Sequence, residues 1–197
     1  MNDIFAAIRT YIADRIAEGF DSEEEIVEST QDYIVYDFET DYYLEHIEQI
    51  TADLFALRHE HEREWLEPTD CDRLDKAFDQ LSLKGIVARQ HFTCCQTCGH
   101  YEIWDEIRQT EDMGQTVRGY VFYHMQDTES AYQDGYLYLA YGATERTAEA
   151  MQKIGHEIMD ALQNAGLVVS WNGELNKRIG VQIEWKRRRF TTPSFNH

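Results

Sequence analysis

The first 84 residues place apolar side chains at intervals of three and four positions, the spacing of amphipathic helices. Helices are predicted over residues 2–18, 23–36, 39–65 and 70–84. Gly19 follows the first as a C-cap, and Pro68 breaks the third. Helices joined by such short connections usually pack as antiparallel pairs. The N-terminal part is therefore expected to be all-helical.

After Gly85 the pattern changes to short apolar segments typical of strands, with helical segments between them. Strands are predicted over 86–93, 119–126, 136–141, 167–171 and 179–185, and helices over 95–108 and 145–165. The last strand alternates apolar and polar positions, which indicates one buried and one solvated face. The sequence thus predicts an α+β protein, with an all-helical part followed by a five-stranded, mostly antiparallel sheet that has helices packed on one face.

Charge is divided unevenly between these two parts. The 197 residues carry a formal net charge of −19, and residues 1–84 hold 23 acidic and 7 basic side chains. We therefore expect an acidic helical region, 1–84, and an α+β domain, 85–190, which could also form one compact unit. The negative charge disfavours nucleic acid and anionic membranes as partners. It favours a protein partner, in particular a basic one, and a homodimer is compatible with it; the alternative is that the acids only solvate helix faces.

Hydropathy predicts a cytoplasmic protein. No apolar run approaches the ~20 residues that span a bilayer. The first residues lack the basic start and uninterrupted apolar core of a signal peptide. In a reducing compartment the four cysteines are expected to be free thiols.

Three of the four cysteines lie in one short segment, Cys94–Cys98, where a predicted strand meets a predicted helix. A Cys-x-x-Cys at a helix N-terminus suits a redox thiol, because the helix dipole and free N–H groups stabilise a thiolate. The thioredoxin fold is disfavoured, since it needs a cis-proline and none lies between Pro68 and Pro193.

The same segment suits zinc, whose structural sites are rich in thiolates. The predicted metal ligands are Cys94, Cys95, Cys98 and His100. A closed tetrahedral site usually takes two Cys-x-x-Cys halves, and the second half is missing. Further ligands would then have to come from His91, His124 or Cys71. A third interpretation is that these cysteines are buried packing residues.

A second polar cluster follows the next predicted strand. His124, Asp127 and Glu129 offer an imidazole and two carboxylates within six residues, a set that can transfer protons or bind a metal. Together with Cys95 and Cys98 they form the predicted catalytic set of a thiol- or metal-dependent enzyme. That hypothesis requires the two strands to be neighbours, so that both loops reach one end of the sheet. The alternative is a solvated loop that caps a helical turn.

Four consecutive cations, Lys186–Arg189, follow the last strand. Such a run can contact phosphate. No Gly-rich phosphate loop or Gly-x-Ser-x-Gly elbow accompanies it. In a chain of this negative charge we expect the cations to pair with the acidic helical region, within the chain or across a dimer.

The strings ARQHFTCCQTCG, GYVFYHMQDTE, LYLAYGA and WNG resemble those of an uncharacterised bacterial family, classed as a domain of unknown function. The resemblance covers roughly residues 85–188, with a looser match over the helices before them. It implies a bacterial, cytoplasmic protein and brings no activity, cofactor or functional residue. The leading hypothesis from the residues is a non-catalytic protein-binding or regulatory module that uses its acidic helical surface. The alternative is a thiol- or zinc-dependent enzyme centred on the cysteine segment.

Overall fold

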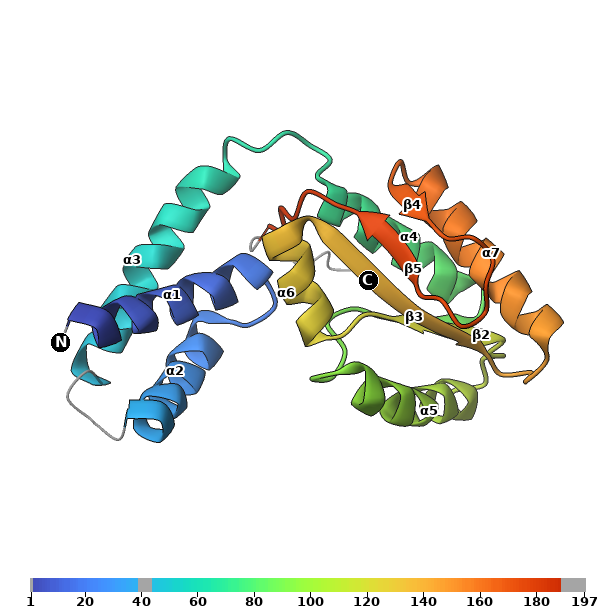
Figure 1. The fold of residues 1–197 in the computed structure, drawn as a ribbon, viewed down its shortest axis with the longest axis horizontal. Helices are drawn as coiled ribbons and strands as arrows, with labels where there is room; N and C mark the ends of the chain where they lie inside the picture. The colour runs from blue at the N-terminus through green and yellow to red at the C-terminus, as the bar shows by residue number, and fades with distance from the viewer. Residues whose placement is uncertain (1, 39–43, 189–197) are drawn as a thin grey trace. The chain divides into compact units, whose positions relative to one another are not determined.

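The structure, a computed structural model, describes residues 2–38 and 44–188 (Figure 1). The chain forms two compact units, which we call the helical unit, Met1–Glu67 with Lys186–His197, and the sheet unit, Pro68–Trp185. Among the described helices, none combines the length and apolar composition that crossing a bilayer requires. The predicted division of the chain into domains after residue 84 stays a prediction.

The helical unit contains three of the predicted helices. They are α1 (Asn2–Glu18), α2 (Glu23–Phe38) and α3 (Leu44–Glu62). Residues 39–43, the predicted start of the third helix, lie outside the described residues. The apolar stripes that predicted these helices meet in one core, because only packing against each other removes them from water. Its buried members are Ile8, Ile12, Ile16, Ile26, Ile34, Ile47, Ile50 and Phe55.

The C-terminal basic run also belongs to the helical unit. The guanidinium of Arg187 lies 4.5 Å from the ring centroid of Phe20, a cation–π contact. Arg188 Nε lies 3.7 Å from a carboxylate oxygen of Glu67. The expected pairing with the acidic helical region is thus confirmed at Arg188, whereas Arg189 lies outside the described residues.

The sheet unit interleaves four helices with five strands. Its elements are α4 (Asp70–Leu83), β1 (Ile86–Arg89), α5 (Gln96–Asp112), β2 (Gly119–Phe122), α6 (Met125–Asp134), β3 (Tyr136–Ala143), α7 (Ala148–Asn164), β4 (Val168–Ser170) and β5 (Ile179–Gln182). The strand order is β1-β2-β3-β5-β4. β1 and β2 are parallel, and the other three pairs are antiparallel. The predicted α+β class and the mostly antiparallel five-stranded sheet are confirmed.

Helices cover both faces of the sheet, whereas the sequence predicted one covered face. Figure 1 shows α5 below the sheet and α4 and α7 above it. On β2, Gly119 faces Ile154 of α7, and Phe122 faces Gly99 of α5. The physical reason is that every residue of β2 is buried. A strand with two apolar faces needs cover on both.

Two helix starts also differ from the prediction. No helix was expected after the second strand, yet α6 begins there with His124 as its N-cap. Asp127 N–H donates to His124 Nδ1 (3.3 Å), and the Asp127 carboxylate accepts from His124 N–H (3.1 Å), which forms a capping box. The last helix, α7, begins at Ala148 and not at the predicted residue 145, because Thr147 caps it: Thr147 Oγ1 accepts from Ala150 N–H (3.1 Å).

Candidate functional site

Parallel pairing of β1 and β2 brings the segments that follow them to the same end of the sheet. Met125 N–H donates to the Thr93 carbonyl (3.1 Å). His91 Nδ1 lies 2.8 Å from Thr128 Oγ1. The condition set for a convergent site, that these two strands are neighbours, is therefore confirmed. The carboxyl ends of neighbouring parallel strands are a common place for ligand sites in α/β sheets.

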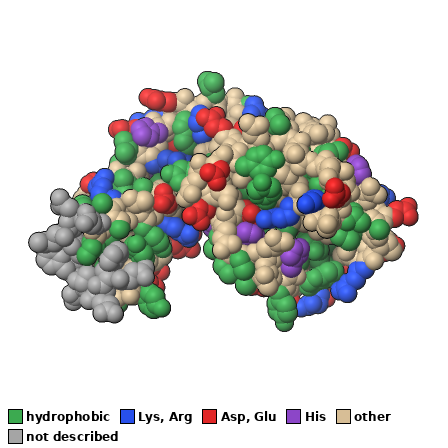
Figure 2. Space-filling model, in the orientation of Figure 1, with side chains coloured by type: hydrophobic (Ala, Val, Ile, Leu, Met, Phe, Trp, Pro, Cys, Tyr) green, Lys and Arg blue, Asp and Glu red, His purple; other side chains and the backbone are tan. Residues whose placement is uncertain are grey.

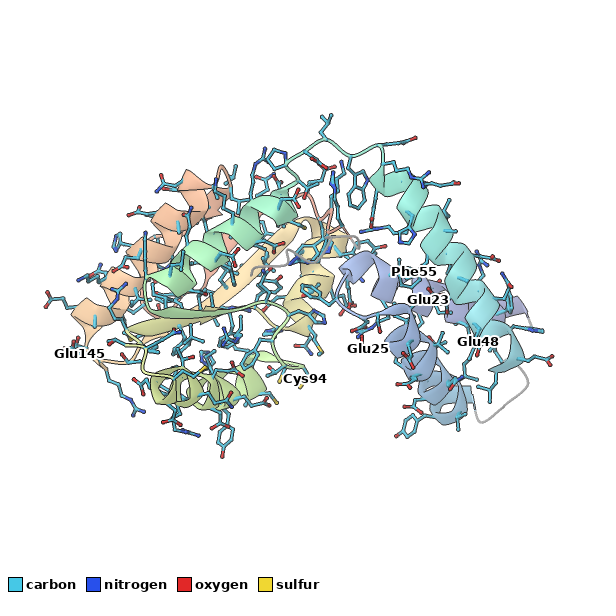
Figure 3. The ribbon with its side chains drawn as sticks, turned by 180° about the vertical axis from the view of Figure 1, so that it is seen from behind. Glu23, Glu25, Glu48, Phe55, Cys94 and Glu145 are labelled. Atoms are coloured by element: carbon cyan, nitrogen blue, oxygen red, sulfur yellow. The ribbon has the colours of Figure 1, made fainter. Side chains whose placement is uncertain are left out.

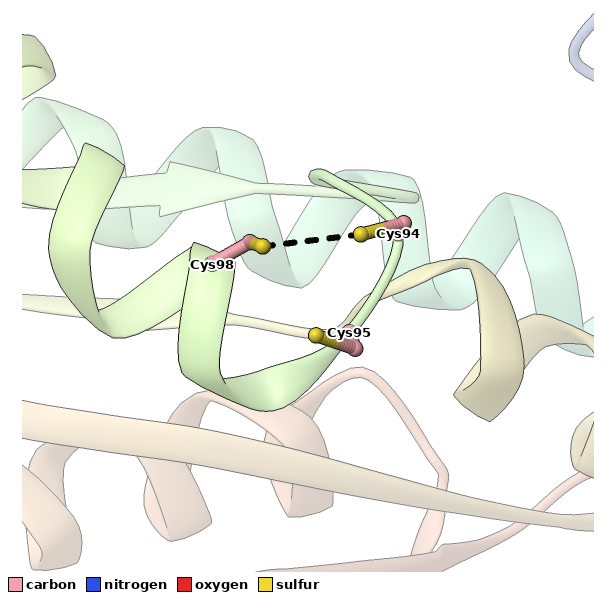
Figure 4. Close-up of side chains that lie close together, drawn as sticks. All are labelled: Cys94, Cys95 and Cys98. Atoms are coloured by element: carbon pink, nitrogen blue, oxygen red, sulfur yellow. Dashed lines mark hydrogen bonds between the residues drawn. The ribbon is translucent and has the colours of Figure 1, made fainter.

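The three cysteines of the predicted metal site form a tight group (Figure 4). The Sγ atoms of Cys94, Cys95 and Cys98 all lie within 4.8 Å of one another, and Cys94 Sγ and Cys98 Sγ are 3.5 Å apart. Cys94 is exposed and the other two are half-buried, so the packing interpretation, which needs buried thiols, does not fit them. Cys71, which is buried in α4, is not part of the group.

The loop that carries the cysteines is held in an unusual conformation. His91 and Thr93 have φ of 51° and 59°, values uncommon for residues other than glycine. Cys95 is extended, with φ −155° and ψ 170°, and serves as the N-cap of α5. A Cβ at Gly99 would lie 2.4 Å from the ring of Phe122, so glycine here lets the first turn of α5 lie directly on the sheet. This packing fixes where the thiols stand relative to β2.

The two thiols of the Cys-x-x-Cys differ in acidity. The backbone N–H of Cys98 and then its thiol lower the pKa of Cys95. The neighbouring thiols of Cys94 and Cys95 raise the pKa of Cys98 to about 11. Cys95 is therefore the better nucleophile of the two at neutral pH. The group can bind a soft ion through three thiolates or exchange thiol and disulfide.

His100, predicted as the fourth ligand, does not join the three thiols. Residues two apart on a helix point to different sides, so His100 turns away from Cys98. Its Nδ1 lies 3.4 Å from Tyr120 Oη, and its ring packs edge-on against Phe122, with centroids 5.2 Å apart. Burial and the positive charge of Arg178 lower the pKa of His100. A neutral imidazole beside the sheet is the result.

The structure divides the predicted trio of His124, Asp127 and Glu129. His124 and Asp127 are both 4% exposed, and His124 Nε2 lies 3.0 Å from Asp127 Oδ2. Because His124 Nδ1 accepts a backbone N–H, its proton resides on Nε2, and burial lowers the pKa of the imidazole. Glu129 is exposed and accepts from Gln133 (3.2 Å). Helix capping accounts for the buried pair, whereas the alternative interpretation expected a solvated loop here.

Sequence reasoning missed Arg178 and Thr128. Arg178 Nη2 donates to the Asp127 carboxylate and to the Tyr138 carbonyl, which places a cation against the buried pair. Thr128 Oγ1 contacts His91. Thr128 lies inside the predicted polar cluster, between Asp127 and Glu129, but its contact with His91 depends on the tertiary fold. No local pattern marks Arg178, which only the tertiary fold brings to the site.

Comparison with known proteins yields one match. No curated protein and no solved structure matches the chain. A family model described as a domain of unknown function matches residues 1–189, so the resemblance seen over residues 85–188 extends through the helices before them. The chain therefore belongs to the family described as Domain of unknown function (DUF6891).

Proposed function

We propose that the chain binds a thiophilic metal ion, zinc in the first instance, through Cys94, Cys95 and Cys98. The approach of the three Sγ atoms to within 4.8 Å of one another carries the proposal. Tetrahedral zinc with Zn–S bonds of about 2.3 Å places its sulfurs about 3.8 Å apart. Cys94 Sγ and Cys98 Sγ already lie 3.5 Å apart, so small side-chain rotations complete the geometry. A set of soft thiolates favours zinc over magnesium or calcium.

The fourth coordination position falls to a ligand from outside the cluster. Cys94 is exposed and His100 turns toward Tyr120, so water or a bound molecule would complete the tetrahedron. Three protein ligands with one open position are typical of catalytic zinc sites. Bound zinc would supply Lewis-acid activation of that water or molecule. This chemistry supports the thiol- or zinc-dependent enzyme that the sequence predicted as an alternative.

Thiol ligands bind metal only when they are deprotonated and reduced, which restricts the compartment in which the site can work. Metal binding requires deprotonated cysteines, and the hydrogen bonds from Cys98 lower the pKa of Cys95, which favours its thiolate form. Free thiols persist in a reducing compartment. The bacterial, cytoplasmic setting implied by the family resemblance is part of the proposal for that reason.

Metal analysis of the protein purified under reducing, metal-free conditions tests this function. After reconstitution with one equivalent of zinc and desalting, we expect about one zinc per chain. Cys98→Ser and Cys95→Ser should each weaken zinc binding more than about 100-fold, because each removes a ligand. Substitution with Co²⁺ should give thiolate-to-metal charge-transfer absorption.

The matched control is Cys71→Ala, which removes the cysteine of α4 that lies outside the group. It should retain its zinc and its absorption with Co²⁺. Equal zinc contents in the wild type and in Cys98→Ser would contradict the proposal, as would a metal-free wild type after reconstitution.

A second function, binding of a basic protein partner, is favoured by a feature of the helical unit. Glu23, Glu24 and Glu28 of α2 line a hollow together with Glu48 of α3. Figure 3 shows Glu23 and Glu48 on these neighbouring helices. Among the described residues, no basic side chain lines this hollow, so its field attracts cations. We propose a non-catalytic, regulatory contact with a basic protein at this acidic hollow.

A Lys-rich 12-residue peptide serves as the basic probe of the acidic hollow. Its affinity should fall about tenfold between about 50 and 500 mM salt, since exposed charges are screened. The triple variant Glu23→Gln, Glu24→Gln, Glu48→Gln should bind weakly at every salt concentration. Its control removes the exposed charges Glu145 and Glu149 of the sheet unit. Equal losses in the two variants would contradict a specific hollow.

A further inference from the structure

A cavity of about 280 Å³ lies beside the first turn of α5 in the sheet unit. Five of the polar side chains that line it are Gln96, His100, Tyr120, Lys177 and Arg178. Apolar walls come from β3, from α7 and from the segment before β5, through Ala140, Met151 and Leu175. The cavity therefore joins a polar side to an apolar side, as small-molecule sites do.

The strand pairing explains why the cavity exists. The β3–β5 ladder ends at Leu139, whereas β3 continues to Ala143. The hydrogen bond from Ile183 N–H to the Gly135 carbonyl shows that the peptide groups of Gly135 face β5. In a strand, the peptide groups of every second residue point toward the same neighbouring strand. Counting in twos from Gly135, Tyr141 is the first residue beyond the ladder whose peptide groups point toward the β5 side. Tyr141 lines the cavity, and the β3–β5 ladder gives it no partner among the described residues of β5.

The charge of the cavity is opposite to that of the chain. Lys177 and Arg178 line it, and among its described lining residues there is no acid. His100 also lines the cavity and offers ring nitrogens as hydrogen-bonding groups. Figure 2 shows Lys, Arg and His side chains with apolar ones between them on the viewed face of the sheet unit. In a chain of net charge −19, a basic hollow of this kind selects anions.

Arg178 is held in place for such a role. Its Nη2 donates both to the Asp127 carboxylate and to the Tyr138 carbonyl. Its guanidinium also lies 5.7 Å from the Tyr138 ring centroid. Nε has no hydrogen-bond partner among the described residues. The Nη2 hydrogen bonds thus orient the guanidinium while Nε has no partner in the described part of the chain, and this orientation lowers the entropic cost of binding an anion.

We propose that this cavity binds a small organic anion, with its carboxylate against Lys177 and Arg178 and its apolar body against Met151 and Leu175. The volume exceeds what an inorganic ion would fill, and the apolar walls suit a carbon skeleton. The site uses none of the cysteines and is independent of metal binding. Gln96 directly follows Cys95, so the ligand would share the first turn of α5 with the cysteine cluster.

Titration of ¹⁵N-labelled protein followed by NMR tests the site at constant ionic strength. Sodium benzoate is the organic anion, benzyl alcohol its neutral analogue and inorganic phosphate its inorganic counterpart. Benzoate should shift the amide resonances of Gln96 and Tyr141 saturably. Benzyl alcohol and phosphate should bind at least about tenfold more weakly, because each lacks one of the two features that the cavity recognises.

Two variants and one control complete the experiment. Lys177→Gln and Arg178→Gln should each weaken benzoate about tenfold or more, whereas Lys153→Gln, at an exposed position of α7 outside the cavity, should leave it unchanged. Arg178→Gln also removes a partner of Asp127, so the exposed Lys177 provides the variant that does not depend on folding. Equal binding of benzyl alcohol, preference for phosphate, equal effects at Lys177 and Lys153, or no saturable shift would each overturn the proposal.

Discussion

Replacement of Asp127 by alanine is expected to lower the free energy of unfolding of the sheet unit by about 3 kcal/mol. Asp127 is 4% exposed, and its carboxylate accepts from the backbone N–H of His124 and from Arg178. The alanine variant leaves the guanidinium without its counter-charge and opens the capping box of α6. Leaving a partly buried cation without its counter-charge destabilises the fold by more than the intact ion pair stabilised it.

Urea unfolding monitored by circular dichroism measures this loss, with the slope of the transition as the check on a two-state process. Glu129→Ala is the matched control, because Glu129 is an exposed acid on the same helix. It should change the free energy of unfolding by less than about 0.5 kcal/mol. If the two variants unfolded at the same urea concentration, Asp127 would not hold this end of the sheet.

Gly99→Ala is expected to destabilise the sheet unit by about 1–3 kcal/mol. In an exposed helix the same change would stabilise by about 1 kcal/mol, because alanine has the higher helix propensity. The sign reverses here because a Cβ would lie 2.4 Å from the ring of Phe122. Phe122 is fully buried and packs against Phe92, with ring centroids 5.8 Å apart, so the ring has no room to yield. The helix must move instead.

Thermal unfolding of Gly99→Ala and of Glu102→Ala, an exposed site on the same helix, provides the comparison. The control should unfold within about 2 °C of the wild type, whereas Gly99→Ala should unfold several degrees lower. Movement of α5 should also change the alkylation rate of Cys95, because its environment at the helix start depends on that packing. An unchanged or raised melting temperature for Gly99→Ala would show that the helix is not tightly seated on the sheet.

The helices of the first 62 residues were predictable because their stripes at three- and four-residue spacing form the core directly. The helix α6 was not, since it is short and its cap is His124, a residue that local preference rarely places there. The covered second face of the sheet was also missed. Sequence periodicity distinguishes buried from exposed positions, but β2 is buried on both faces and lacks that contrast.

The same distinction between local and distant information applies to the site. The group Cys94–Cys98 lies within five residues, so the motif alone located it. His100 was predicted as a further ligand from its spacing in sequence, whereas in the structure its ring lies against Tyr120 and Phe122. Arg178 was missed because it meets Asp127 from 51 positions away. A contact at that separation leaves no trace in local sequence.

The discontinuity of the helical unit has a consequence for biosynthesis. The first segment of the helical unit ends at Glu67, and its second segment begins at Lys186. Residues 68–185 must therefore be translated between these two segments. At about 5–20 residues per second, that interval is on the order of ten seconds. The contacts of Arg187 with Phe20 and of Arg188 with Glu67 therefore form only after the whole sheet unit has been translated. The three helices of the helical unit emerge well before the cations that contact them.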